Sequence, residues 1–328
     1  MTKNIYFNDA IIGNGKVTVG LDRRGRILRT YFPTPDFKSQ ISDIYVAFKI
    51  YDETEEEEYI HVCGEEYGTE YEQKYVQDTN ILKTNMYILD KDISIMQTDF
   101  APLNENMCIR NYEIKNSSNK KIIIYPMVHS RNNSEVFMKI HQVCLCKMRL
   151  FIIIIGYSVA IFSKSEIMEK RVNSDIQLEY PIDYFKNFEN IEQEYVGLSS
   201  KSTIKFEKIV IEPNETKEFP LYIYFNENDK KEMSGLEMEI IRVKKINVKD
   251  REHELEKYWK KLIERHVKHD LSRVDLKTAE IYKQSIILLN ILKNNETGAV
   301  IAALESDEKR EHSRRISDMY GQETYIML

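Results

Sequence analysis

Hydrophobic and polar residues alternate along most of the first 250 residues, which is the pattern of half-buried β-strands. Val17, Val19 and Leu21 alternate with small or polar neighbours, residues 22–25 supply turn chemistry, and a second alternating segment follows at 27–32. A turn that closes two such segments often needs a residue with positive φ, and Gly25 stands in that place. The pattern therefore predicts a β-hairpin.

The same alternation predicts further strands separated by short polar turns, at 44–51, 59–63, 86–89, 93–100, 107–115, 121–129, 203–211 and 219–225. The apolar run 151–162 predicts a buried strand or strand pair, because about 20 residues are needed to cross a bilayer as a helix. Segments 139–150 and 164–200 lack a clear period and are expected to be loops with short strands. No strand–helix–strand alternation is visible, so the fold class is mainly β, a large antiparallel sandwich.

The period changes from two to that of a helix near Asp250. A helical stripe follows, in which the lone Trp259 is expected to be the packing anchor; its other members are Leu255, Tyr258, Leu262, Ile263 and Val267. A second helix is predicted over 276–292, with Ser272 and Asp275 as a capping pair. Its run of Ile and Leu at 286–289 predicts burial nearly all round, and Asn294, Asn295 and Gly298 supply its stop.

These patterns divide the chain into a β-domain at 1–248, a linker helix at 249–272 and the start of a helical domain at 273–328. The sequence ends on the apolar residues 325–328. Exposed Ile, Met and Leu forgo about 1.5–3 kcal/mol of burial free energy each. We therefore expect the helical domain to be truncated, and its apolar helix to favour self-association or a separate barrel fragment as partner.

Composition narrows the possible functions. Apolar residues make up 42% and charged residues 30%, which suits a folded core, and the net charge of −6 argues against nucleic-acid binding. No secretory signal is visible at the N-terminus, so we expect a cytoplasmic protein without membrane association. The acidic run 53–58 is expected to be a solvated hairpin tip.

The cysteines are not spaced for a metal site. Cys144 and Cys146 have one residue between them, whereas zinc ligands need two to four, and Cys63 and Cys108 stand alone. We expect them to be small apolar residues in a reducing compartment, and we expect neither a metal nor another cofactor.

Two segments resemble a known family. The run IIGNGKVTVGLDRRGRILRTYFPTPD at 11–36 resembles the start of bacterial and archaeal glucoamylases and glucodextranases of glycoside hydrolase family 15. The run YKQSIILLNILKNNETGAVIAALESDEKREHS at 282–313 is similar to the first barrel helix and following loop of the same family. The resemblance implies an N-terminal β-supersandwich, a linker helix and the first helix of an α/α six-hairpin barrel.

The activity that this resemblance implies is exo-acting hydrolysis of α-linked glucans with inversion at the anomeric carbon. Inversion needs two carboxyl groups about 6.5–9.5 Å apart, one as general acid and one to activate water. In the family both are glutamates deep in the barrel, and a barrel of roughly twelve helices of about 11–12 residues each is longer than the segment after Asp275. We therefore assign no catalytic residue in this chain and expect it to be inactive alone.

One sugar-binding motif of the family falls inside the chain, in a degenerate form. The family pattern Tyr-x-Trp-x-Arg-Asp aligns with residues 318–323, where Tyr320, Gln322 and Glu323 replace the Trp, Arg and Asp. Gln322 lacks the charged fork of a guanidinium, and the longer Glu323 displaces its carboxylate by about an ångström. Asp318 replaces the Tyr, and Leu304 stands where the family has Pro.

Two other functions stay open. The sandwich can be a non-catalytic module that binds glucan or a protein partner, since sugar platforms are built from aromatic residues on a strand face and the chain contains 21 Tyr. Alternatively, the chain is a fragment of the related maltose and kojibiose phosphorylases, which combine a sandwich with a barrel. The Gly-Asn-Gly segment at 13–15 and the Thr-Gly-Ala segment at 297–299 favour the hydrolases.

Overall fold

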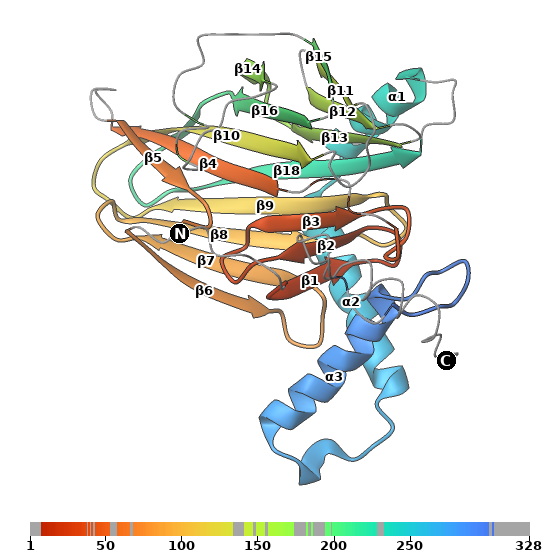
Figure 1. Cartoon of the computed structure of the whole chain (residues 1–328). Coiled ribbons are helices and arrows are strands. Elements are labelled where there is room, and N and C mark those ends of the chain that lie inside the picture. The colour runs from red at the N-terminus through yellow and green to blue at the C-terminus, as the bar shows by residue number, and fades with distance from the viewer. Residues whose placement is uncertain are drawn as a thin grey trace, which may run out of the picture.

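The structure is a computed structural model of the whole chain. It describes residues 8–37, 39, 41, 43–52, 58–65, 68–133, 141–146, 149–154, 157–173, 182, 185, 194–197, 199–227, 233–301 and 304. Within these residues the fold is mainly β, with two antiparallel sheets that form a sandwich and three helices after them (Figure 1).

The first sheet, sheet A, contains nine strands in the order β1-β2-β3-β4-β10-β16-β14, with β5 beside β4 and β17 beside β10. Its strands are β1 (Ala10–Gly13), β2 (Thr18–Leu21), β3 (Ile27–Tyr31), β4 (Asp43–Asp52), β5 (Glu58–Val62), β10 (Ile122–Asn133), β14 (Ile167–Asn173), β16 (Ser199–Phe206) and β17 (Ile209–Ile211).

The second sheet, sheet B, also contains nine strands, in the order β15-β11-β12-β13-β18-β9-β8-β7-β6. Its strands are β6 (Thr69–Tyr75), β7 (Leu82–Ile88), β8 (Ile93–Phe100), β9 (Met107–Asn116), β11 (His141–Cys146), β12 (Arg149–Ile154), β13 (Tyr157–Ser163), β15 (Glu194–Gly197) and β18 (Thr216–Glu227). All described strand pairs in both sheets are antiparallel, as the sequence predicts.

The main core lies between the two sheets, because every second residue of each strand points inward. Phe48 of β4 makes an edge-on contact with Tyr112 of β9, at 5.1 Å between ring centroids. Tyr112 also stacks with Phe219 of β18, which contacts Phe206 of β16. The inward residues of these strands form one continuous buried cluster.

Helices follow the sandwich: the first two pack on the outer face of sheet B, and the third lies beside the second helix and β1, and projects away from the sandwich (Figure 1). They are α1 (Met233–Lys244), α2 (Val248–His266) and α3 (Leu276–Ile291), with a 3-10 turn η3 (Leu271–Arg273) before α3. Leu255, Trp259 and Ile263 of α2 are buried in a second cluster with Phe162 and Tyr222 of the sheet. The predicted packing stripe of this helix is confirmed for these three residues, with Trp259 as its anchor. Leu262 and Val267 are half-buried against the same cluster, whereas Tyr258 is exposed.

Two sequence predictions need correction. The helical layer begins at Met233, inside the segment 1–248 that was assigned to the β-domain, and Ile240 and Val243 of α1 are buried against the sheet. Segments 139–150 and 164–200 were expected to be loops with short strands, and they contain short strands, β11 and β14 among them. The apolar run 151–162 is a strand pair, β12 and β13, as predicted.

The second correction concerns α3, which is not buried all round. Ile287 and Ile291 are buried in the second cluster, but Ile281, Leu288 and Leu289 on the other side are exposed. Of the predicted capping pair, Asp275 caps the helix and its side chain accepts a hydrogen bond from the Thr278 amide at 3.0 Å, whereas Ser272 lies in η3 and its amide donates to Asp270. The periodic pattern predicted the helix itself. It could not predict which faces have a neighbour.

Candidate functional site

The predicted sugar-contacting residues, Tyr320, Gln322 and Glu323, lie outside the described residues, as does Asp318. Their role stays a prediction. The chain is described as far as Ile301 and at Leu304, which is buried and whose carbonyl accepts a hydrogen bond from the Tyr31 hydroxyl. Leu304, the last described residue, is therefore attached to the end of β3.

The loop after α3 is held against the sandwich. Lys293 and Val300 form an antiparallel bridge, and the side chain of Asn294 accepts hydrogen bonds from the Glu296 and Thr297 amides at 2.9 and 3.2 Å. The amide of Asn294 also donates to the Asp36 carboxylate at 3.1 Å. Asn294 thus shapes the loop and ties it to the segment that follows β3.

The turn between β1 and β2 meets this loop. The Asn14 amide donates to the carbonyls of Pro102 and Glu105 at 2.6 and 2.8 Å, and its oxygen accepts from the Lys16 and Val17 amides. Gly15 has φ +83°, and a Cβ at this position would lie 2.4 Å from the Asn295 side chain. The Gly-Asn-Gly segment is therefore a structural junction between two loops that are 280 residues apart in the sequence.

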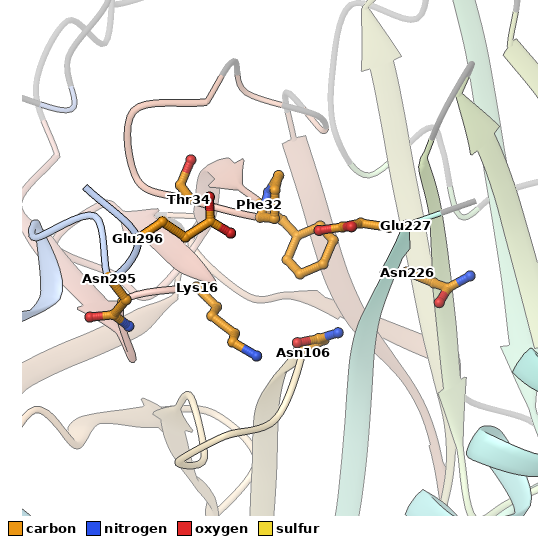
Figure 2. A pocket seen from close by; sticks show the side chains of 10 residues that line it. Lys16, Phe32, Thr34, Asn106, Asn226, Glu227, Asn295 and Glu296 are labelled. Atoms are coloured by element: carbon orange, nitrogen blue, oxygen red, sulfur yellow. The ribbon is translucent and has the colours of Figure 1, made fainter. Parts of the chain in front are cut away.

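A pocket of about 310 Å³ opens where these segments converge (Figure 2). Phe32 and Pro33 line it; Phe32 is buried and its ring stacks on Phe225 at 5.5 Å. Six polar side chains on its wall have no hydrogen-bond or ion partner among the described residues: Lys16, Thr34, Asn106, Glu227, Asn295 and Glu296. Figure 2 shows the carboxylates of Glu227 and Glu296 pointing into the space between them.

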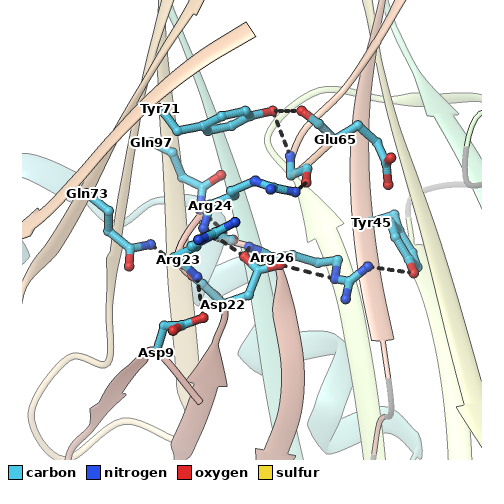
Figure 3. A network of polar contacts seen from close by, with 12 residues as sticks. Asp9, Asp22, Arg23, Arg24, Arg26, Tyr45, Glu65, Tyr71, Gln73 and Gln97 are labelled. Atoms are coloured by element: carbon cyan, nitrogen blue, oxygen red, sulfur yellow. Dashed lines mark hydrogen bonds and ion pairs between the residues drawn. The ribbon is translucent and has the colours of Figure 1, made fainter. Parts of the chain in front are cut away.

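The opposite end of the β2–β3 hairpin is clamped by a polar network (Figure 3). The Asp22 side chain accepts from the Arg24 and Arg26 amides at 2.9 Å, and the Arg26 guanidinium donates to the Tyr45 hydroxyl at 3.0 Å. Gln73 donates to the Asp22 carbonyl at 3.0 Å. This network fixes the hairpin whose other end supplies the floor of the pocket.

A buried ion pair lies beneath the same turn. Arg110 of β9 and Asp99 of β8 are both buried, with 2.6 Å between Arg110 Nε and Asp99 Oδ1. Arg110 Nη2 also donates to the Gly25 carbonyl at 2.7 Å, and Gln97 donates to that carbonyl at 2.9 Å and to Asp99 at 2.6 Å. The pair ties the hairpin turn to sheet B.

The exposed side of α3 is a second candidate surface. Leu276, Ile281, Leu288 and Leu289 have exposed fractions of 85, 57, 37 and 40%. Apolar residues three, four or seven positions apart share one side of a helix, so Ile281 and Leu288 form a stripe. The inner side of α3 is held by the ion pair between Lys283 and Asp78, at 2.9 Å.

The described residues do not form a metal site, since no group of three or more His, Cys, Asp or Glu side chains comes together in them. Cys63 and Cys108 are free and buried, and burial raises the pKa of Cys63 to about 12. Such thiols are protonated and inert at neutral pH. None of the described helices is long and apolar enough to cross a membrane.

Comparison with solved structures matches this chain to a bacterial glucoamylase in complex with acarbose. The TM-score is 0.69 at 13% identity, over 92% of this chain and 43% of the glucoamylase. The fold of this chain is therefore similar to the N-terminal β-sandwich region of that enzyme. This chain therefore spans less than half the length of the structure it matches, and at this identity the likeness shows the fold alone.

A weaker match is the family GH92 α-mannosidase from Bacteroides thetaiotaomicron, with a TM-score of 0.47 at 10% identity, over 88% of this chain and 39% of that one. No protein-family model and no curated protein sequence matches the chain.

Sequence reasoning did not find the pocket. Its polar residues come from five separate segments, and none has a spacing that marks a site. The one available signal was the Gly-Asn-Gly segment at 13–15, which was used only as a mark of resemblance.

Proposed function

We propose that this chain is the non-catalytic sandwich portion of a glucoamylase-like, inverting exo-glycosidase that acts on α-linked glucans. The observation that carries the proposal is the fold match to bacterial glucoamylase over 92% of the chain. The motifs at 11–36 and 282–313, which resemble the same family, support it. A fold hosts many activities, so the assignment of activity is by analogy.

Among the described residues, the carboxylates of Glu227 and Glu296 share one space, but both side chains are exposed to solvent and neither lies in the apolar surroundings of a general acid. An inverting mechanism needs a carboxylic acid that stays protonated near the glycosidic oxygen, and a second carboxylate across the bond. Burial raises the pKa of Asp99, but its carboxylate is paired with Arg110 and sealed in the core. We therefore expect the chain alone to release no glucose.

The first experiment incubates the purified chain with maltodextrin and dextran and measures released glucose, with a bacterial glucoamylase as positive control. The expected result is no release above a blank, because neither protonation of the leaving oxygen nor activation of water is available. Release that a single Glu→Gln substitution in this chain abolishes would place the active site here and overturn the proposal.

The apolar side of α3 is the surface on which a helical catalytic partner would dock. A stripe of exposed Ile and Leu on a helix that buries only Ile287 and Ile291 forgoes burial free energy until a neighbour covers it. We expect the chain to self-associate through this surface, or to bind a separate barrel fragment.

Light scattering tests this surface. The variant Ile281→Gln/Leu288→Gln should be more monodisperse than the parent chain, whereas Leu89→Gln, which changes an exposed leucine with an exposed fraction of 56% in the turn after β7, should behave as the parent. Equal behaviour of all three proteins would refute the docking surface.

A further inference from the structure

Polar and charged side chains gather in the pocket at the junction of the β1–β2 turn, the end of β3 and the loop after α3. Some charged side chains of the described surface are paired, such as Lys49 with Glu58 at 2.7 Å and Lys249 with Glu218 at 2.5 Å. In the pocket, one ammonium, two carboxylates, two amides and a hydroxyl face a common space without such partners among the described residues.

We propose that this pocket is a saccharide-binding site that takes one terminal hexose unit of a neutral oligosaccharide. Each hydroxyl of a sugar both donates and accepts a hydrogen bond, so a site for it needs donors and acceptors side by side. The amides of Asn106 and Asn295 supply both, Lys16 supplies donors, and Glu227 and Glu296 supply charged acceptors. Hydrogen bonds to charged groups are the stronger ones.

The walls of the pocket are fixed by contacts that do not involve these six side chains. Asn14 anchors the β1–β2 turn through two carbonyls, Asn294 anchors the loop after α3 to Asp36, and Tyr31 holds Leu304. Gly15 allows the two loops to approach closely. The backbone that carries the six polar side chains is thus held in place by other residues, which reduces the backbone entropy lost on binding.

Size and charge define the ligand further. A volume of about 310 Å³ lies at the lower end of the range for small-molecule sites, which suits a single sugar ring. Lys16, Glu227 and Glu296 together carry a formal charge of −1, which disfavours phosphorylated or acidic sugars. Because Lys16, Glu227 and Glu296 are also solvent-exposed, the rest of an oligosaccharide can extend into solvent.

The choice of a glucan as the probe rests on the proposed function, but the site itself does not. The test is a titration of the full chain with maltotriose and with glucose 6-phosphate, followed by NMR. We expect maltotriose to bind with a Kd of about 1 mM and glucose 6-phosphate to bind at least tenfold more weakly.

The variants separate this pocket from other surfaces. Glu227→Ala/Glu296→Ala should weaken maltotriose binding about tenfold or more, since two charged acceptors are lost. The matched control Glu264→Ala changes an exposed glutamate on α2 and should leave the affinity unchanged. The variant Glu227→Gln/Glu296→Gln keeps the shape of both side chains but removes their negative charge. It should reduce the difference in affinity between maltotriose and glucose 6-phosphate.

Three results would each overturn the inference: no maltotriose binding at about 10 mM, undiminished binding by Glu227→Ala/Glu296→Ala with an unchanged melting temperature, or glucose 6-phosphate binding as tightly as maltotriose in the parent chain. Glucose release and association through α3 do not depend on this pocket. If maltotriose does not bind the pocket, the proposed function is therefore unaffected. If the proposed function is refuted, the saccharide site is likewise unaffected.

Discussion

The buried ion pair between Asp99 and Arg110 makes a sharp test of how the hairpin turn is held. The substitution Asp99→Leu leaves a buried guanidinium without its counter-charge, which costs about 3–5 kcal/mol. Among the described residues, the Arg110 guanidinium would keep its hydrogen bond to the Gly25 carbonyl, at 2.7 Å, and lose the one to Asp99. The double variant Asp99→Leu/Arg110→Met removes both charges, and Gln97 still donates to Gly25 at 2.9 Å. We therefore expect the double variant to be more stable than Asp99→Leu.

Urea unfolding measures these differences. The lone Trp259 is buried between α2 and sheet B, so its fluorescence reports the helical layer, while circular dichroism reports the strands. With an m-value of about 3 kcal/mol/M, a loss of 3–5 kcal/mol lowers the midpoint by about 1–1.7 M. A double-mutant cycle compares the parent chain, the two single variants and the double variant. It should give a coupling energy between Asp99 and Arg110 of about 2 kcal/mol or more.

A matched exposed pair serves as control. Lys249 and Glu218 are also in contact, at 2.5 Å, but their side chains are 60 and 41% exposed. The substitutions Glu218→Leu and Lys249→Met should each change the free energy of unfolding by about 1 kcal/mol or less. The reasoning is refuted if Asp99→Leu costs no more than Glu218→Leu, or if the double variant costs the sum of its two single variants.

Two further predictions concern pH and backbone conformation. Burial lowers the pKa of His61 from 6.5 to about 4, so about 3 kcal/mol of stability is present above pH 6.5 and is lost as the pH falls toward 4. The urea midpoint of His61→Leu should therefore fall less steeply between pH 7 and 4 than that of the parent chain. The same steepness in both proteins, or an equal effect of the exposed His266→Leu, would contradict this. Gly15→Ala and Gly68→Ala both place a side chain at positive φ, which costs about 1–2 kcal/mol. Of these two positions, only Gly15 has a neighbour within 4 Å. Thermal unfolding should therefore show Gly15→Ala to be less stable than Gly68→Ala by about 1 kcal/mol. The further substitution Asn295→Ala should remove that difference, and its persistence would show that the contact is not the cause.

Most of the sandwich could be predicted from the sequence, because apolar and polar residues alternate along its strands as a half-buried sheet requires. The turn at Gly25 and the strand pair within 151–162 were both predicted, and both are present. The alternation did not indicate strands where it is irregular, as in β14, whose register with β16 shifts after Ile167. It also failed for α1, whose short stripe of Ile240 and Val243 was not recognised as helical.

The candidate site could not be predicted, because it depends on which loops meet. Lys16, Asn106, Glu227 and Glu296 have unremarkable neighbours in the sequence, and only the pairing of β18 with β9 and the docking of the loop after α3 bring them to one space. The exposed stripe of α3 is a similar case. Its residues are as apolar as those that face the core, so composition does not distinguish an inner from an outer side.

The position of β18 in sheet B has a consequence for synthesis of the chain on the ribosome. β18 lies between β9 and β13, so the meander β6–β9 and the meander β11–β13 are joined only by a strand that begins at Thr216. At about 5–20 residues per second, the 100 residues that separate Asn116 from Thr216 take roughly 5–20 s to emerge. During that interval β9 presents an open edge to the cell, and a chaperone or a neighbouring nascent chain can reach it before β18 does.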